Sequence, residues 1–277
     1  MTPGLMPEVM AAMNDTVLVS VEGVVATLTL NRPKVLNALN GDMIEALSSV
    51  LDRVEADPAL RVIILKGAGN GFMAGGDIKF FTEITGLAPA DRRARFERFI
   101  NDVHPVILRL RRLRQPVIAA VHGACAGFGM SLLMAADLAI AAEDSFFTLA
   151  YIHLGVSPDG GSTFALPRHL GAKKAMEIAL LGDRFDAAGA LALGLVNWVV
   201  PGPSLNERSR ALAERLAKGP ADAQAATKRL LNRSLDRTLE AQLQAELEAF
   251  ARCTASGDFP EAVAAFVEKR APRFGQN

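Results

Sequence analysis

The sequence predicts an α/β protein in which strands and helices alternate first and helices alone follow. Short β-rich apolar runs recur over the first half of the chain, and most lead into a glycine-rich turn or a helix. From Pro158 onward, apolar residues recur mainly at helical spacing. With 277 residues, 50% of them hydrophobic, the chain can bury a sizeable core. We expect a disordered lead over residues 1–14, an α/β core with the active site over 15–204, and a helical region over 205–277.

Two strands and a helix open the α/β core. Residues 16–21 and 24–30 read as strands around a Glu-Gly turn, and the second alternates apolar side chains with threonines. A helix is expected over residues 41–54, because apolar side chains share one of its faces. Residues 1–14 lack the basic start and apolar centre of a signal peptide.

Two buried strands farther along the chain each end in a glycine-rich loop. Residues 62–65 lead to the loop Phe72–Asp77, and residues 116–121 lead to the loop His122–Gly129. Glycine lets backbone N–H groups turn outward and lets a ligand approach the main chain closely. Either loop alone is an ordinary strand-to-helix turn, but two such loops can converge on a single oxygen atom. Together they predict an oxyanion hole made of backbone amides.

In the rest of the sequence, apolar residues recur mostly at helical spacing. A long charged helix is expected over residues 90–114, and a buried helix follows the second glycine loop as far as Ala136. Residues 115–136 carry no charge and could span a bilayer by length, but their proline-led β-rich start and their glycines predict a core strand, a loop and a helix. Short strands are expected over 138–142 and 146–149, and later helices over 172–181, 221–235, 239–251 and 260–270.

Charge and motifs exclude several classes of function. The 30 basic side chains balance the 30 acidic ones, so no net field gathers nucleic acid or an anionic membrane. Cys125 and Cys253 form neither a disulfide framework nor a metal-ligand spacing, which suits a reducing cytoplasm. The histidines share no metal spacing, and no Walker loop, dinucleotide fingerprint or nucleophile elbow occurs. We expect no metal, no nucleotide cofactor, and no nucleic-acid or membrane partner.

Five sequence blocks occur in an order that is specific to one family. They are Leu30–Lys34 with Asn37–Leu39, Phe72–Ile78, Gly123–Leu132, Gly155–Gly161 and Phe266–Arg270. Through them the chain resembles the crotonase family, the enoyl-CoA hydratase/isomerase superfamily, from about Val24 to Phe274. The resemblance implies a spiral of ββα repeats, C-terminal helices that drive trimers or dimers of trimers, and an acyl-CoA thioester as substrate. Coenzyme A is then part of the substrate, and no separate cofactor is expected.

The resemblance also implies which ligand the glycine loops bind. The thioester oxygen would accept hydrogen bonds from the backbone N–H groups of Gly76 and Phe128. Family members usually carry glycine or alanine where Phe128 stands, but only the N–H of this residue is required. Lys269 would reach a phosphate of coenzyme A, from a neighbouring subunit, although by itself it is an ordinary solvated charge. Further residues are implied to line the coenzyme A path, namely Lys34, Leu36, Ala74 and Ile78.

The acidic residues distinguish one reaction of the family from another. Hydration of a double bond uses two carboxylates, and at the matching positions this chain has Ser131 and Tyr151. Asp159 remains, at the position where isomerases of the family carry an acid that takes a proton from the α-carbon and returns it at the γ-carbon. Burial against the acyl chain should raise the pKa of this acid. The resemblance thus favours an isomerase with a single catalytic aspartate, and the other interpretation makes Asp159 the N-cap of the following helix.

Accessory roles and other functions stay open. Tyr151 would orient Asp159 or the substrate, or fill the core with its ring, and Ser131 is interpreted as a small helix residue with no base beside it. A hydratase-like activity is one alternative. Another is an aryl-CoA dehalogenase with Asp159 as nucleophile and an aromatic residue near position 151, but the histidine base of such enzymes is not evident here. A third is an acyl-CoA-binding relative without catalysis.

Overall fold

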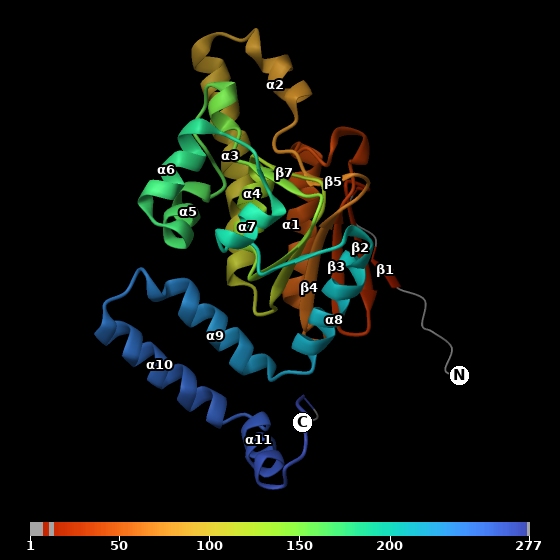
Figure 1. Cartoon of the computed structure of the whole chain (residues 1–277), viewed down its shortest axis with the longest axis vertical. Coiled ribbons are helices and arrows are strands. Elements are labelled where there is room, and N and C mark those ends of the chain that lie inside the picture. Colours follow the sequence, from red (N-terminus) through yellow and green to blue (C-terminus); the bar gives the residue numbers. More distant parts are fainter. Residues whose placement is uncertain (1–7, 11–13, 276–277) are drawn as a thin grey trace.

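The strands form two sheets. Most helices pack around them, and the last two, over residues 239–254 and 258–267, extend away from this body (Figure 1). The computed structural model describes residues 8–10 and 14–275. One sheet has seven strands in the order β1-β2-β3-β4-β6-β8-β11, and the other has four in the order β10-β9-β7-β5. The strands are β1 (Glu8–Met10), β2 (Val17–Glu22), β3 (Val25–Leu30), β4 (Val62–Gly67), β5 (Gly71–Met73), β6 (Val117–Val121), β7 (Ala124–Ala126), β8 (Leu138–Ala142), β9 (Phe146–Thr148), β10 (Phe185–Asp186) and β11 (Trp198–Val200).

Helices follow the strands in chain order and dominate the C-terminal part. The α-helices are α1 (Gly41–Ala56), α2 (Ile78–Thr85), α3 (Pro89–Arg112), α4 (Phe128–Ala135), α5 (Ser162–Leu170), α6 (Ala172–Leu181), α7 (Ala187–Ala192), α8 (Leu205–Ala217), α9 (Ala221–Ser234), α10 (Leu239–Thr254) and α11 (Asp258–Val267). Short 3-10 helices are η1 (Pro33–Val35), η2 (Tyr151–Leu154) and η3 (Gly202–Ser204).

Three pairs of strands, β4–β5, β6–β7 and β8–β9, repeat the same step. In each pair the first strand joins the large sheet and the second joins the small one. β4, β6 and β8 are parallel neighbours, and so are β5, β7 and β9. Helices α2 and α3 follow the first pair, and α4 follows the second (Figure 1). Because parallel neighbours end on the same side of a sheet, the turns after β5 and β7 lie next to each other.

The large sheet is buried on both faces, which explains the continuous apolar runs in its central strands. In β4, Ile63 and Leu65 belong to the main core with α1, α3 and α4. Val62 and Ile64 point to the opposite face and pack in a smaller cluster with Leu205 of α8. The apolar stretch that could span a bilayer by length forms β6, β7 and α4 instead, and no helix among the described residues is long and apolar enough to cross a membrane.

The structure differs from the sequence-based expectation in three places. Residues 8–10 form β1, paired antiparallel with β2, whereas the sequence predicts a disordered lead; residues 1–7 and 11–13 of that lead lie outside the described residues. The glycine loops contain β5 and β7. The later, mainly helical part contains β10 and β11. These four strands are two or three residues long, too short for an alternating pattern to be recognised.

Helix α9 is attached to the core by a buried lysine. Lys228 Nζ lies 2.7 Å from Asp137 Oδ2 and also donates to the main-chain oxygens of Leu110 (3.1 Å) and Gln115 (3.0 Å). The same carboxylate oxygen of Asp137 accepts a hydrogen bond from the N–H of Val117, at 2.8 Å, where β6 begins. Burial lowers the pKa of Lys228, and Asp137 opposes that shift. This ion pair therefore attaches α9 to the end of α3 and to the start of β6.

Replacing Lys228 by methionine should destabilise the protein by about 3 kcal/mol, because the buried Asp137 carboxylate loses its counter-ion. Urea unfolding at neutral pH measures the change. The double variant with Asp137→Asn should recover a large part of the loss, and Lys173→Met, at an exposed position of α6, should have almost no effect. A loss for Lys228→Met as small as that for Lys173→Met would contradict this account of α9.

Candidate active site

The two glycine loops touch. Gly75, after β5, has φ +100°, and a Cβ placed on it would lie 3.5 Å from the Cα of Gly127 and 3.6 Å from the backbone nitrogen of Phe128. Gly127 has φ +51°, and a Cβ on it would lie 3.3 Å from the Cα of Gly75. Both positions thus combine a left-handed backbone with close approach of the opposite loop, which favours glycine. The parallel pairing of β5 with β7 brings the loops together.

Each loop offers one unpaired backbone amide. Phe128 is the first residue of α4, so its N–H has no acceptor within the helix. The residues on both sides of Gly76 are hydrogen-bonded to Leu39. The N–H of Leu39 donates to the oxygen of Gly75 (2.7 Å), and the oxygen of Leu39 accepts from the N–H of Asp77 (2.9 Å). Within the described part of the chain, neither the Gly76 nor the Phe128 N–H donates to another protein group. Two such donors on touching loops can stabilise negative charge on one oxygen.

A buried asparagine supports the first loop. Asn37 is fully buried with φ +58°, and its Nδ2 donates to the main-chain oxygens of Ala68 (2.9 Å) and Gly71 (2.8 Å). Its Oδ1 accepts from the backbone N–H of Arg32 at 2.8 Å. Sequence reasoning included Asn37 only as part of a family block and gave it no role. The structure shows that it connects the segment before α1 to the loop that carries Gly76.

Asp77 is a structural residue. Its Oδ1 accepts from the N–H of Lys79 at 2.9 Å, which caps α2, and its Oδ2 forms an ion pair with Arg32 at 2.7 Å. Burial alone would raise the pKa of Asp77, but the hydrogen bonds from Arg32 and Lys79 outweigh it and the pKa lies below its ordinary value. The Asp77 carboxylate therefore stays ionised, and both of its oxygens have protein partners.

Asp159 lies between η2 and α5, and its side chain is not the helix cap. Helix α5 has Gly161 as N-cap residue without a side-chain hydrogen bond. The main-chain oxygen of Asp159 instead accepts from Ser162 Oγ and from Ser131 Oγ, both at 3.0 Å. Its carboxylate oxygen Oδ1 accepts a hydrogen bond from the Tyr151 hydroxyl. Burial raises the pKa of Asp159, and the Tyr151 hydrogen bond partly opposes the shift.

The Asp159 segment packs against the helix turn that carries the Phe128 amide. A Cβ placed on Gly160 would lie 2.7 Å from the Cβ of Ser131 and 2.8 Å from the ring of Phe128. Tyr151 remains a hydrogen-bond donor, because burial and the neighbouring Asp159 raise its pKa far above the ordinary value. The structure thus brings together Phe128, Ser131, Tyr151 and Asp159, and the pairing of β5 with β7 adds Gly76 beside them.

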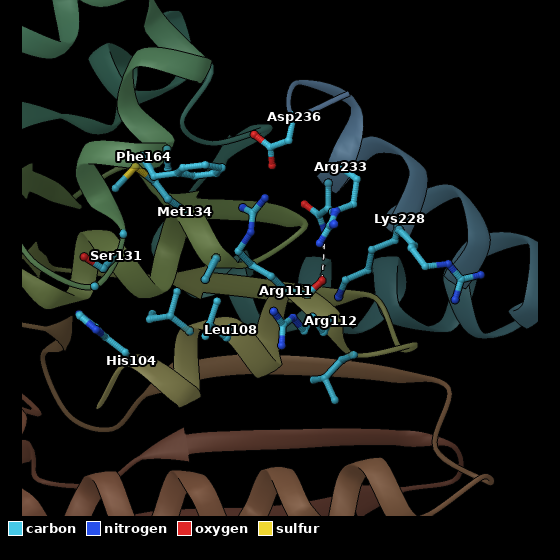
Figure 2. Close-up of a pocket in the computed structure, with 18 of the residues that line it drawn as sticks. His104, Leu108, Arg111, Arg112, Ser131, Met134, Phe164, Lys228, Arg233 and Asp236 are labelled. Carbon is cyan, nitrogen blue, oxygen red and sulfur yellow. Dashed lines mark hydrogen bonds between the residues drawn. The ribbon is translucent and has the colours of Figure 1, made fainter. Parts of the chain in front are cut away.

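His104 is a residue of this region that sequence reasoning missed. It lies on α3, it lines a cavity together with Ser131 and Gly160 (Figure 2), and its charge acts on Asp159 to lower the pKa of that carboxyl. The sequence shows His104 as a lone histidine on a charged helix, and no local pattern marks which side of the helix faces Asp159. Only the packing of α3 against α4 reveals it.

The residues expected on the coenzyme A path fall into two groups. The N–H of Ala74 donates to the oxygen of Leu36 at 2.9 Å, so Lys34 in η1 and Leu36 lie alongside the first loop. Ile78, 55% exposed, begins α2 directly after that loop. Lys269 follows α11, which lies at the opposite end of the molecule from β5 and β7 (Figure 1). A single chain therefore does not bring Lys269 to the other four residues.

Unpaired main-chain amides beside a partly buried carboxylate are features of enzymes that stabilise an enolate. The chain belongs to the enoyl-CoA hydratase/isomerase family, whose model matches residues 20–277. It is 40% identical to 1,2-epoxyphenylacetyl-CoA isomerase from Escherichia coli (strain K12) over 263 residues, which cover 95% of this chain and 99% of the relative.

Solved structures show the same relationship. An enoyl-CoA hydratase from Polaromonas sp. JS666 superposes with a TM-score of 0.88 at 33% identity, over 94% of this chain and 99% of that chain. An enoyl-CoA hydratase from Bacillus anthracis superposes with a TM-score of 0.87 at 31% identity, over 95% of this chain and 100% of that chain. The crotonase-like fold expected from the sequence is thereby confirmed. The relatives carry both isomerase and hydratase names.

Removing the Tyr151 hydroxyl should raise the pKa of Asp159 further, because a donor to a carboxylate favours its ionised form. Carbon-13 NMR titration of labelled aspartate carboxyls in the wild type and in Tyr151→Phe measures the shift. The Asp77 carboxyl, held by Arg32, is an internal control whose titration should stay unchanged. An Asp159 pKa that is unchanged or lower in Tyr151→Phe would show that the hydroxyl does not stabilise the carboxylate.

Proposed function

We propose that this protein is an acyl-CoA isomerase that moves a double bond by proton transfer, with Asp159 as its only catalytic carboxylate. The observation that carries the proposal is the position of Asp159, which is hydrogen-bonded to Tyr151 and packed through Gly160 against the turn that carries the Phe128 amide. Hydration uses two carboxylates, and Ser131 and Tyr151 stand where they would be. The name of the Escherichia coli relative, an isomerase of a CoA thioester, agrees with this proposal.

In the proposed mechanism the thioester oxygen of a 3-enoyl-CoA accepts hydrogen bonds from the N–H groups of Gly76 and Phe128. The Asp159 carboxylate takes a proton from the α-carbon, and the resulting dienolate places its negative charge on that oxygen. The protonated Asp159 then returns the proton to the γ-carbon, and a 2-enoyl-CoA leaves. The raised pKa of Asp159 suits both steps, because the group must accept the proton and hold it. Coenzyme A belongs to the substrate, so we propose that no separate cofactor takes part and that the enzyme acts in the cytoplasm.

Replacing Asp159 by asparagine should lower kcat for conversion of 3-enoyl-CoA to 2-enoyl-CoA by about 100-fold or more. The absorbance of the conjugated product measures the rate. The variant should fold at least as stably at neutral pH, because burial disfavours the carboxylate that it removes. Asp183→Asn, at an exposed position before β10, is the matched control and should keep full activity. The proposal fails if Asp159→Asn keeps wild-type activity, or if the wild type hydrates 2-enoyl-CoA faster than it isomerises 3-enoyl-CoA.

His104 supports a second candidate, an aryl-CoA dehalogenase, because it supplies the histidine near Asp159 that the sequence alone did not reveal. In that reaction an Asp159 oxygen attacks the halide-bearing ring carbon, and the halide leaves as an aryl ester forms. Water then loses a proton to His104 and hydrolyses the ester, which releases the hydroxyaryl-CoA and restores the carboxylate. Halide release from chlorobenzoyl-CoA, lost in His104→Gln, would favour this candidate over the isomerase.

We further propose that α10 and α11 pack against other copies of the chain to form a trimer. Their apolar side chains are widely exposed, and the large ones are Leu239 (69%), Leu243 (55%), Leu247 (63%), Phe250 (71%) and Phe266 (86%). Exposed apolar area of this extent on neighbouring helices is typical of an interface. The assembly would also carry Lys269 to a neighbouring subunit's site.

Light scattering should give about three or six times the chain mass of 29.5 kDa. Leu247→Glu should reduce this mass, because it places a charge in the buried interface. Glu248→Gln, at the next position of α10, serves as the control and should leave the mass unchanged. A monomeric wild type would contradict the trimer.

A further inference from the structure

A cavity of about 590 Å³ leads from the Asp159 segment to a group of cations. Its near end is formed by His104, Ser131 and Gly160. Figure 2 shows the cations at the end opposite His104 and Ser131, on α3 and α9. Between the two ends the wall is apolar and includes Leu108 and Phe164. These cations include Arg111, Arg112, Lys228 and Arg233.

The cations outnumber the acids at the far end. Asp236 is the carboxylate that lines the cavity, and its Oδ1 is already engaged by Arg168 at 3.1 Å. Lys228 is neutralised by Asp137. By contrast, the guanidinium groups of Arg111, Arg112 and Arg233 form no ion pair and no hydrogen bond within the part of the chain that the structure describes. The far end therefore carries positive charge without a protein partner.

Arg111 is the central cation of this group. It is partly buried, its Cζ lies 5.7 Å from the centroid of the Phe164 ring, and burial lowers its pKa. Its main-chain oxygen accepts a hydrogen bond from Asn232 Nδ2 at 3.0 Å, which fixes α9 beside α3 at this point. A guanidinium that has lost much of its water without gaining an acceptor is stabilised by an anion, best by a carboxylate that binds it with two oxygens.

The distance along the cavity sets the kind of ligand. His104 and Arg111 are two turns apart on α3, which corresponds to about 10 Å along the helix. A ligand that reaches from the Asp159 segment to Arg111 thus needs an extended apolar stem with a negative group at its end. An acyl chain that bears a second carboxylate has this form.

We propose that the cavity binds an acyl chain ending in a carboxylate, so that the preferred substrates are CoA thioesters of unsaturated dicarboxylic acids. This inference rests on the proposed function, since it places the thioester end of the same molecule at Gly76 and Phe128. The apolar wall holds the methylene stem, and Arg111, assisted by Arg112 and Arg233, binds the distal carboxylate.

The test compares pairs of 3-enoyl-CoA substrates of equal length, one ending in a methyl group and the other in a carboxylate, over a series of chain lengths. At the best length the wild type should favour the carboxylate-ended substrate by at least about tenfold in kcat/KM. Arg111→Gln should bring this ratio close to one, mainly through KM. Arg215→Gln, at an exposed arginine of α8 outside the cavity, should keep the wild-type ratio. The inference is wrong if the methyl-ended substrate is preferred at every length, or if Arg111→Gln leaves the ratio unchanged.

A binding experiment separates this inference from the proposed function. Calorimetry with Asp159→Asn measures the dissociation constants of the two CoA thioesters without turnover. Tighter binding of the carboxylate-ended thioester, lost on adding Arg111→Gln, supports the cavity assignment even if the wild type isomerises neither substrate. A free dicarboxylate and inorganic phosphate are the remaining probes. If either binds at Arg111 while the two thioesters bind equally, the cavity serves a free anion and the assignment to the acyl chain is overturned.

Discussion

The contact between Gly75 and Gly127 is the constraint on which the candidate site depends. A side chain on either residue would crowd the opposite loop, so the contact that brings the segments of Gly76 and Phe128 together is made by backbone alone. The parallel pairing of β5 with β7 fixes this contact. The parallel pairing of β4 with β6 in the large sheet supports it. A site built in this way needs little adjustment when charge develops on an oxygen between the loops, since the donors are already in place.

A partly buried carboxylate lies beside these amides at some cost in stability. Partial burial raises the pKa of Asp159, and the Tyr151 hydroxyl donates a hydrogen bond to its carboxylate. The contrast with Asp77 is informative, because Arg32 and the N-terminus of α2 hold that carboxylate in its ionised form. These two aspartates, one after Gly76 and the other after Pro158, thus have opposite environments. The Asp77 carboxylate is fixed as part of the scaffold, whereas the Asp159 carboxyl has a raised pKa, as the proposed proton transfer requires.

The sequence predicts most long elements because they carry enough residues for a period to emerge. The helix expected over 172–181 forms over those residues, and the charged helix expected over 90–114 forms over 89–112. Strands such as β10 and β11 escape prediction because two or three residues hold no pattern, and their pairing partners lie far away in the chain.

The site shows the same division between local and distant information. Glycine loops at strand ends could be recognised locally, and the resemblance made Asp159 a candidate. The hydrogen bond from Tyr151 depends on the turn between η2 and α5, the role of His104 depends on how α3 packs, and the pairing of Lys228 with Asp137 depends on the docking of α9. No local sequence pattern predicts any of these contacts.

Phe128 and Gly160 constrain each other over evolutionary time. The Phe128 ring is buried, and it occupies the space that any side chain at position 160 would need. A lineage that acquires a bulky residue at position 128 must therefore already hold glycine at 160, or lose the fit of the Asp159 turn. A small residue at 128 would remove the clash with the ring, but Ser131 and the φ of +60° would still disfavour a side chain at position 160. Covariation between the two positions among relatives would reflect this steric contact.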